Sequence, residues 1–379
     1  MDITAAMSEH GHEQVLLIAD PPSQLRAVIA IHSTALGPSL GGVRFWRYER
    51  EYDAILDALR LSEAMTWKAS AAGLDQGGGK AVVLVDDPDV PRSPSLLEAL
   101  GRAIDDLGGR YLAAEDVGAT TRDMDLIATV TPWVTGVSEA DGGSGDPSPV
   151  TAWGVLHAMR AAVRAGAGAD ATLAGRRVAI QGAGKVGTDL ARLATDAGAS
   201  VILSDVNTDR AESVASRYDG RVVSPDEILT VDCDVLAPCA LGGILNQQSV
   251  PTLRCRAVCG AANNQLDDPS IAARLAERDI LYVPDFIAGA GGIINIAEEF
   301  RGYSRSRALK RAAGIGDTTA TILARAAADS TTPERVALAM ARERVARAGP
   351  DQRWQPGDAA AWTNGAPLRV LRPAGTVNV

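Results

Sequence analysis

Two lysines in the N-terminal half occupy surroundings that are unusual for a charged side chain. Lys68 lies in the segment AMTWKAS, and Lys80 follows three consecutive glycines in DQGGGKAVV. Lysine is ordinarily a solvated surface residue, and that alternative applies to both positions. A lysine in apolar or glycine-rich surroundings near a second cation has a lowered pKa and can act as a general base. The three glycines also leave space for another body to approach the backbone.

A carboxylate and two glycines could complete such a site. Asp116, in AAEDVGA, ends a predicted strand at a loop, where a carboxylate can shuttle a proton. The same position could equally belong to a helix cap or a turn. Gly41 and Gly42, in SLGGVR, offer backbone N–H groups that could face a substrate carboxylate.

A glycine-rich turn in the second half predicts a dinucleotide site. Gly182, Gly184 and Gly187 form the pattern G-x-G-x-x-G directly after the predicted strand RVAIQ and before a predicted helix. Glycines allow a tight turn and a close approach of the backbone to a pyrophosphate, which then lies on the helix N-terminus. Asp205 closes the next strand, where a carboxylate binds the ribose hydroxyls and repels a 2′-phosphate, so NAD is favoured over NADP. A fold of this type without a cofactor is the alternative.

Alternating short β-rich and helical segments must position these residues, which indicates an α/β protein. In the first half we predict a hairpin of strands 14–20 and 26–34, a helix over 52–68, a strand over 80–87, a helix over 98–107, and a strand within 109–118 that runs into a loop.

The second half has the repeating strand–helix pattern of a parallel sheet. A Gly/Ser/Pro-rich stretch at 141–149 indicates an inter-domain loop. A predicted helix, 150–167, and a βαβ unit, 176–206, follow it. Short apolar runs at 234–237, 256–260 and 280–284 predict central strands of this sheet. Further helices are predicted to begin near Gly291 and at 332–334. An irregular tail is predicted over 349–379, docked through Trp354 or Trp362.

The composition limits the classes of function. The chain has 379 residues, 46% hydrophobic and 22% charged, which is typical of a globular protein with room for two domains. A formal net charge of −10 argues against nucleic acid as a partner and favours a cytoplasmic protein. We expect neither a membrane span nor a secretory signal. The four cysteines and four histidines lack metal-ligand spacing, so we expect no metal site.

Several motifs, in order along residues 13–340, resemble the Glu/Leu/Phe/Val amino acid dehydrogenase family. The runs GLDQGGGK and GAANNQL together are highly specific for this resemblance. The segments HEQV and AVIAIHSTALGP make the chain most similar to the actinobacterial valine dehydrogenases of the leucine type. The other matching segments are LGPSLGGVRF, AMTWKAS, GGRYLAAEDVG, DPSPVTAWGV, QGAGKVG, APCALGGILN and LYVPDFIAGAGGIIN.

The resemblance implies a reaction in which hydride passes from the Cα of an L-amino acid to nicotinamide and the resulting imine is hydrolysed, reversibly. Lys68 would pair with the substrate carboxylate, Lys80 would activate water or ammonia, and Asp116 would assist proton transfer. The cofactor-binding positions would be Gly182, Gly184, Lys185, Val186, Gly187, Asp205, Val206, Ser148, Thr151, Cys239, Ala240 and Asn263.

The resemblance also implies two domains and an apolar substrate pocket. A catalytic and oligomerisation domain would cover 1–140, a Rossmann-type NAD domain 150–316, and C-terminal helices at about 317–348 would return to the first domain. The pocket positions are Leu40, Met65, Ala114, Ile293 and Ile296. They carry no charge to pair with a glutamate side chain, which favours an aliphatic, short branched substrate.

One position departs from the family pattern. Gly289 stands where relatives have an asparagine that helps to hold the substrate carboxylate, and losing such a hydrogen bond costs about 1.5–3 kcal/mol. Three interpretations remain open: a working NAD-dependent, homo-oligomeric dehydrogenase of aliphatic L-amino acids, a specialised dehydrogenase or imine reductase for a non-standard amino acid or imine, and a non-catalytic NAD-binding protein. Retention of Lys80 and Asp116 argues against the third, and we predict the first.

Overall fold

The computed structural model describes residues 2–349, 353–355 and 358, and these form two compact units. The first unit comprises the described residues of 1–145, 296–304 and 341–379, and the second comprises 146–295 and 305–340. The prediction of an α/β protein with two domains is confirmed.

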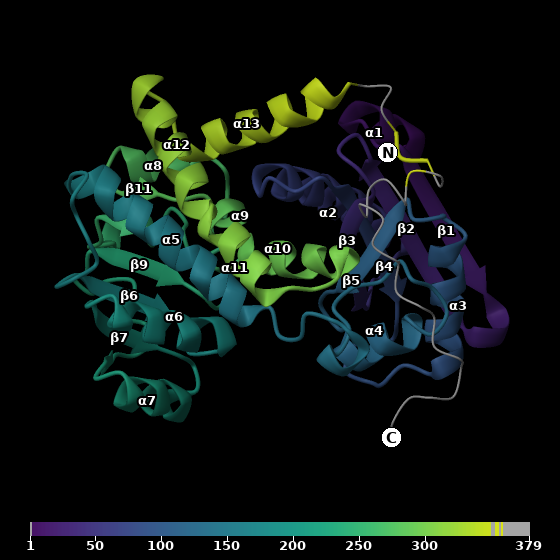
Figure 1. Ribbon diagram of the computed structural model, residues 1–379, viewed down its shortest axis with the longest axis horizontal. Coiled ribbons are helices and arrows are strands. Elements are labelled where there is room, and N and C mark those ends of the chain that lie inside the picture. Colours follow the sequence, from purple (N-terminus) through teal and green to yellow (C-terminus); the bar gives the residue numbers. More distant parts are fainter. Residues whose placement is uncertain (1, 350–352, 356–357, 359–379) are drawn as a thin grey trace. The chain divides into compact units, whose positions relative to one another are not determined.

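A mixed five-stranded sheet forms the centre of the first unit, with strand order β1-β2-β4-β3-β5 (Figure 1). The predicted hairpin is present, because β1 and β2 pair antiparallel, while β3 runs parallel to β4 and β5. The strands are β1 (Gln14–Asp20), β2 (Leu25–Ser33), β3 (Ser39–Trp46), β4 (Gly77–Leu84) and β5 (Tyr111–Glu115), and the helices are α1 (Ile3–His10), α2 (Glu51–Ala71), α3 (Pro94–Asp105) and α4 (Thr121–Ile127).

Helix α2 packs against β2 and β4 through one apolar face. Its residues Ala54, Ile55, Ala58 and Leu59 are buried at helical spacing and contact a cluster that includes Val28 and Val82. This packing fixes the orientation of α2, whose last turn carries Lys68.

The second unit is built on a parallel six-stranded sheet with strand order β11-β10-β9-β6-β7-β8. Renumbered from β6, this is the order 6-5-4-1-2-3 of a Rossmann-type sheet, in which ligands bind where the strand order reverses, here between β6 and β9. The strands are β6 (Arg177–Gln181), β7 (Ser200–Ser204), β8 (Arg221–Val222), β9 (Val235–Pro238), β10 (Ala257–Val258) and β11 (Leu281–Tyr282). The helices are α5 (Ser148–Ala167), α6 (Lys185–Asp196), α7 (Thr208–Arg217), α8 (Ile271–Ala276), α9 (Asp285–Ala288) and α10 (Gly291–Ala297).

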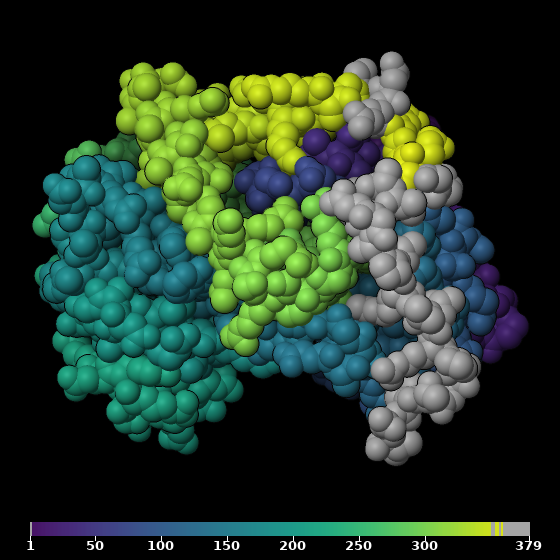
Figure 2. Space-filling model, viewed as in Figure 1, coloured from purple at the N-terminus to yellow at the C-terminus, as the bar shows by residue number. Residues whose placement is uncertain are grey.

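The C-terminal helices α11 (Arg305–Ala313), α12 (Ile315–Ala328) and α13 (Pro333–Ala348) correct one expectation. We expected residues 317–348 to return to the first domain, but 305–340 belong to the second unit and only the end of α13 belongs to the first. Helix α12 packs on α5, where Ile315 Cδ1 would lie 2.6 Å from a Cβ at Gly154, so this glycine makes room for the contact. The apolar stripe of α12 predicts burial but does not specify the partner. Figure 2 shows α11 and α12 at the surface of this unit.

The C-terminal tail is described at only a few residues. Trp354 is buried, and its backbone N–H donates to Thr34 Oγ1 at 3.0 Å, so the prediction that this tryptophan docks is confirmed. Trp362 and most of 349–379 lie outside the described residues. Within the described part of the chain, no helix combines the length and the apolar character that crossing a membrane requires. Single 3-10 turns occur at Pro21–Ser23, Glu139–Asp141, Val250–Thr252 and Glu298–Arg301.

Candidate active site and dinucleotide site

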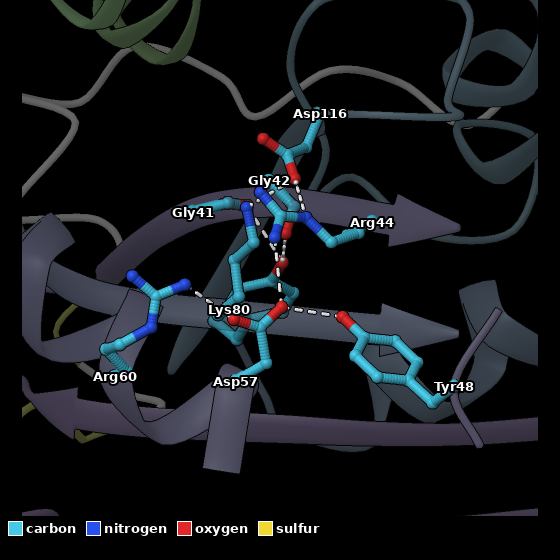
Figure 3. Close-up of polar contacts among 9 residues, drawn as sticks. Gly41, Gly42, Arg44, Tyr48, Asp57, Arg60, Lys80 and Asp116 are labelled. Carbon is cyan, nitrogen blue, oxygen red and sulfur yellow. Dashed lines mark hydrogen bonds and ion pairs between the residues drawn. The ribbon is translucent and has the colours of Figure 1, made fainter. Parts of the chain in front are cut away.

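Lys80 lies in the middle of the central strand β4, with its side chain only 4% exposed. Its Nζ forms an ion pair of 2.7 Å with Asp116 Oδ2 (Figure 3). Burial lowers the pKa of Lys80, and the charge of Asp116 only partly offsets this effect. A buried lysine whose pKa is depressed can exchange a proton with a bound molecule, as predicted for a general base.

Asp116 follows the last residue of β5 and receives two cations on one oxygen. Both Lys80 Nζ and Arg44 Nε contact Oδ2, at 2.7 and 2.9 Å. Burial alone would raise the pKa of Asp116, but the charges of Lys80 and Arg44 outweigh it and lower that pKa. Among the described residues, no side chain or backbone group bonds the other oxygen, Oδ1, and the side chain is 24% exposed. Asp116 is therefore ionised and retains one free oxygen.

The glycines near the site have a packing role that the sequence did not reveal. A Cβ at Gly42 would lie 2.5 Å from Asp116 Cβ, and one at Gly41 would lie 1.7 Å from Gly79 O. The Tyr111 hydroxyl also donates to the carbonyls of Gly41 and Gly42 at 2.8 and 3.2 Å. These glycines therefore allow β3 to lie close enough to bring Asp116 beside Lys80.

The glycines before Lys80 belong to β4 itself, which begins three residues earlier than predicted. A Cβ at Gly78 would lie 2.1 Å from the backbone nitrogen of Thr66 on α2, and one at Gly79 would lie 2.7 Å from the Tyr111 ring. The three glycines were predicted to leave space for a close approach to the backbone, and the groups that lie there are helix α2 and the Tyr111 ring.

Four of the remaining predicted substrate residues lie on elements of the first unit that pack against or pair with β3 and β4. Lys68 and Met65 are half-buried on α2, one turn apart. Leu40 on β3 and Ala114 on β5 are buried. The last two predicted pocket residues lie on α10, Ile293 in the second unit and Ile296 in the first.

The sequence analysis did not predict a network of hydrogen bonds and ion pairs around Arg44. Arg44 Nη1 bonds Asp57 Oδ2 at 2.9 Å, and the same oxygen accepts the Tyr48 hydroxyl at 2.6 Å. Arg60 pairs with the other oxygen of Asp57 at 2.7 Å. Arg44 is two residues after Gly42 on a strand, so alternation could have placed both on one face, but nothing in the sequence indicates Asp57 as its partner.

The glycine turn has the geometry that a dinucleotide requires. Gly182 has φ of +100°, and a Cβ at Gly187 would lie 1.9 Å from Gly182 O. Gly184 precedes α6, and a Cβ added to it would have no neighbouring atom within 4 Å, so space is open at the helix N-terminus. Asp205 Oδ2 accepts the Ala183 N–H at 2.8 Å, which ties the end of β7 to the turn. These features fit the pyrophosphate of a dinucleotide.

Most of the other predicted cofactor residues follow the carboxyl ends of strands of the second unit. Cys239 and Ala240 follow β9, with the Cys239 N–H bonded to Gln181 O at 2.7 Å and Ala240 packed against Gly182. Val206 follows Asp205 and is 91% exposed. The others are Ser148 and Thr151 in the first turn of α5, Asn263 after β10, and Lys185 and Val186 at the start of α6, where Lys185 Nζ lies 3.2 Å from Asp146.

Gly289 ends α9 in a tight environment. A Cβ at this position would lie 3.0 Å from Asp285 O and 3.2 Å from Ala261 O, although φ of −81° suits any residue. A longer side chain therefore requires a shift of the surrounding backbone. Among the residues that the structure describes, no cluster of His, Cys, Asp and Glu could hold a metal, and all four cysteines are free.

Fold and turn together define a two-domain protein of the dinucleotide-binding class, and comparisons with known proteins specify it further. Family models described as the Glu/Leu/Phe/Val dehydrogenase dimerisation domain and as Glutamate/Leucine/Phenylalanine/Valine dehydrogenase match residues 12–132 and residues 142–209 and 203–348. The chain belongs to this family of amino acid dehydrogenases, which are NAD(P)-dependent.

Individual relatives agree with this assignment. The chain is 45% identical to leucine dehydrogenase of Thermoactinomyces intermedius, covering 91% of this chain and 94% of that protein. It is 47% identical to valine dehydrogenase of Streptomyces coelicolor, covering 90% and 94%. The crystal structure of L-tryptophan dehydrogenase from Nostoc punctiforme superimposes with a TM-score of 0.83 at 38% identity, covering 91% and 99%. The predicted resemblance, including that to actinobacterial valine dehydrogenases, is confirmed.

Proposed function

We propose that this protein catalyses the NAD-dependent oxidative deamination of an aliphatic, branched-chain L-amino acid to its 2-oxo acid and ammonia, and the reverse reductive amination. The observation that carries the proposal is the buried Lys80–Asp116 ion pair at 2.7 Å in a chain of this dehydrogenase family. Relatives that cover most of the chain are leucine and valine dehydrogenases.

In this proposal the residues of the first unit handle the substrate and its protons. Lys68 pairs with the substrate carboxylate. An oxidised nicotinamide cofactor would supply the acceptor for the hydride of the substrate Cα. Water then adds to the imine carbon while its proton passes to Lys80 Nζ, which burial keeps poised to accept it. Asp116 Oδ1, the oxygen that neither cation holds, exchanges the proton needed for ammonia to leave.

The substrate class rests on the apolar character of the pocket positions. Leu40, Ala114 and Ile293 are buried, and Met65 and Ile296 are half-buried. A glutamate side chain would need a cation at one of these positions to offset the loss of its hydration. An aliphatic side chain needs only apolar surface, which supports valine, leucine or isoleucine as the substrate.

NAD, and not NADP, is the proposed cofactor because of Asp205. Its Oδ1 and Oδ2 accept the N–H groups of Asn207 and Ala183, both at 2.8 Å, so the carboxylate stays at the end of β7. A carboxylate there accepts ribose hydroxyls and repels a 2′-phosphate. Arg210 lies 3.9 Å from Asp205 and partly offsets this repulsion, which makes the ratio of NAD to NADP turnover worth measuring.

A second candidate function is favoured by Gly289. Because a Cβ there would lie 3.0 Å from Asp285 O, the site is built without the asparagine expected in the family. A substrate that is differently substituted at that point, such as a non-standard amino acid or an imine, would suit a site without the hydrogen bond of that asparagine. The third interpretation, a non-catalytic NAD-binding protein, is opposed by the intact pair of Lys80 and Asp116.

The protein is further proposed to be a cytoplasmic homo-oligomer. The family model that matches 12–132 is described as a dimerisation domain, which supports self-association. Four free cysteines support a reducing compartment.

The test is reduction of NAD and NADP at alkaline pH with a panel of L-amino acids, including valine, leucine, glutamate and tryptophan, beside the Lys80→Ala variant. The proposal predicts turnover of branched-chain amino acids with NAD, and its loss in the variant without loss of NADH binding. Turnover of none of them by a protein that binds NADH would contradict it. Imine reduction in that case would establish the second candidate.

A further inference from the structure

Arg44 connects the buried pair of Lys80 and Asp116 to a surface network. Its guanidinium bonds two carboxylates, Asp116 through Nε and Asp57 through Nη1, both at 2.9 Å. Its side chain is 21% exposed, compared with 4% for Lys80. Arg44 is thus more exposed than Lys80 and contacts the same carboxylate, that of Asp116 (Figure 3).

Asp57 is in turn held by two further groups. The Tyr48 hydroxyl donates to Oδ2 at 2.6 Å, and Arg60 Nη2 bonds Oδ1 at 2.7 Å. Both oxygens of Asp57 are therefore engaged, so its position is fixed. These residues border an open pocket of about 380 Å³ that also contacts Arg44.

The stereochemistry at Asp116 gives this network a consequence for the reaction. Arg44 and Lys80 both bind Oδ2, and this arrangement leaves Oδ1 as the oxygen that can meet a substrate. A carboxylate held by Lys80 alone could rotate about its terminal torsion and exchange its oxygens, because such torsions are soft. A planar guanidinium that is fixed at its other end prevents this rotation.

We propose that Arg44, fixed by Asp57, is a positioning residue that holds the Asp116 carboxylate with Oδ2 on Lys80 and Oδ1 directed to the substrate. This inference rests on the proposed function of Lys80 and Asp116. It adds to that function a residue outside the predicted site. It also adds a chain of ion pairs that runs from Asp57 through Arg44 and Asp116 to Lys80.

Charge changes in this network have predictable directions. The charged and titratable groups around Arg44 are Lys80 on β4, Asp116 after β5, Tyr48 after β3, and Asp53, Asp57 and Arg60 on α2. Arg44 lowers the pKa of both Asp116 and Lys80, so its removal raises both. Asp57 raises the pKa of Lys80, so its removal lowers that pKa. Arg44→Gln should therefore raise the pKa of Lys80, and Asp57→Asn should lower it.

The direct test is an NMR titration of the lysine side chains. The sequence contains only four lysines, so a sample labelled with ¹³Cε-lysine gives few signals, and Lys80→Arg assigns the relevant one. The Lys80 pKa should rise in Arg44→Gln and fall in Asp57→Asn. Arg50→Gln, which breaks the exposed pair of Arg50 with Asp53, is the matched control and should leave it unchanged.

Kinetics separates charge from orientation. Arg44→Gln should lower kcat about 10- to 100-fold, as expected for the loss of one hydrogen bond to a charged group, and should move the kcat/KM profile to higher pH. Arg44→Lys keeps the charge but cannot bond both carboxylates in the same geometry, so it should lose kcat with a smaller shift of the profile. It also serves if Arg44→Gln fails to fold.

The outcomes are distinguishable. An unchanged Lys80 pKa and an unshifted profile in folded Arg44→Gln would overturn the inference and leave Arg44 a structural residue. A wild-type protein that turns over no amino acid, but whose Lys80 pKa moves as described, would contradict the proposed function and not the coupling of Arg44 to the pair.

Discussion

Replacing Asp116 with asparagine should destabilise the first unit in a pH-dependent manner. The change removes the carboxylate that contacts the nearly inaccessible ammonium of Lys80 at 2.7 Å. Loss of one partner of a buried ion pair costs about 3–5 kcal/mol. Because Asp116 is 24% exposed and water can partly replace it, we expect about 3 kcal/mol near neutral pH.

The deficit should become smaller as the pH rises. Burial already lowers the pKa of Lys80, and Asp116 is the largest factor that raises it. In the variant the pKa falls further, so the folded state binds fewer protons than the unfolded state between that pKa and the ordinary value of about 10.4. The free energy of unfolding therefore increases with pH in this window, and the variant approaches the wild type at alkaline pH.

The assay is urea unfolding followed by tryptophan fluorescence from about pH 6 to about pH 10, at constant protein concentration and ionic strength. Asp53→Asn removes the exposed partner of Arg50 and should change stability little at any pH, because solvent screens this pair. The double variant Lys80→Met/Asp116→Asn should recover most of the loss. A deficit no larger than that of Asp53→Asn, or one that is constant with pH, would refute the reasoning.

Three further predictions concern other parts of the chain. Burial raises the pKa of Glu334 to about 7, with a smaller contribution from Asp285. The protonated form stabilises the fold fully below about pH 4.5, and this stabilisation is lost as the pH rises through about 7. Glu334→Gln should remove this pH dependence and increase Tm at pH 8 in a thermal-shift assay, by the equivalent of at most about 3 kcal/mol of stability. Gly187→Ala places a Cβ 1.9 Å from a backbone oxygen and should cost about 1–3 kcal/mol and weaken NADH binding measured by fluorescence. Arg344→Ala removes the guanidinium that bonds Leu74 O at 2.5 Å after α2, and should cost about 1–3 kcal/mol in urea unfolding and raise KM through Lys68.

Matched controls exist for each of these changes. Gly184→Ala introduces a Cβ into open space and should leave stability unchanged, unlike Gly187→Ala. Arg347→Ala, on the exposed face of α13, should be neutral where Arg344→Ala is not. Glu343→Gln, an exposed glutamate of the same helix, should leave the pH dependence of Tm unchanged. Equal effects of a variant and its control on stability, or on its pH dependence for Glu334→Gln, would contradict the corresponding prediction.

Local signals in the sequence were sufficient for much of the fold. Alternating apolar residues predicted the β1–β2 hairpin, and the strand, glycine turn and helix around Gly182 predicted the βαβ unit. Strand β3 was not predicted, because its Gly41 and Gly42 have low β propensity and are required only by the backbone and side chains that approach them. Such tertiary requirements leave no periodic pattern in the sequence.

The sequence predicted individual residues of the candidate site but not the contacts between them. Lys80 and Asp116 were predicted separately, and their contact follows from the strand order β4-β3-β5, which residue spacing does not specify. The role of Arg44 depends on a side chain of α2 and one after β5, 72 residues away. The location of α12 was wrong because an amphipathic pattern gives the buried face and not the surface that covers it.

The central claim, hydride transfer from the Cα of a branched-chain amino acid at the site of Lys80, is tested most directly with L-valine deuterated at Cα. Mass spectrometry of the NADH formed should show one deuterium per molecule with the wild-type protein, and repeated turnover should be lost with Lys80→Ala even though that variant binds NADH. NADH without deuterium, or undiminished transfer in the variant, would contradict the claim.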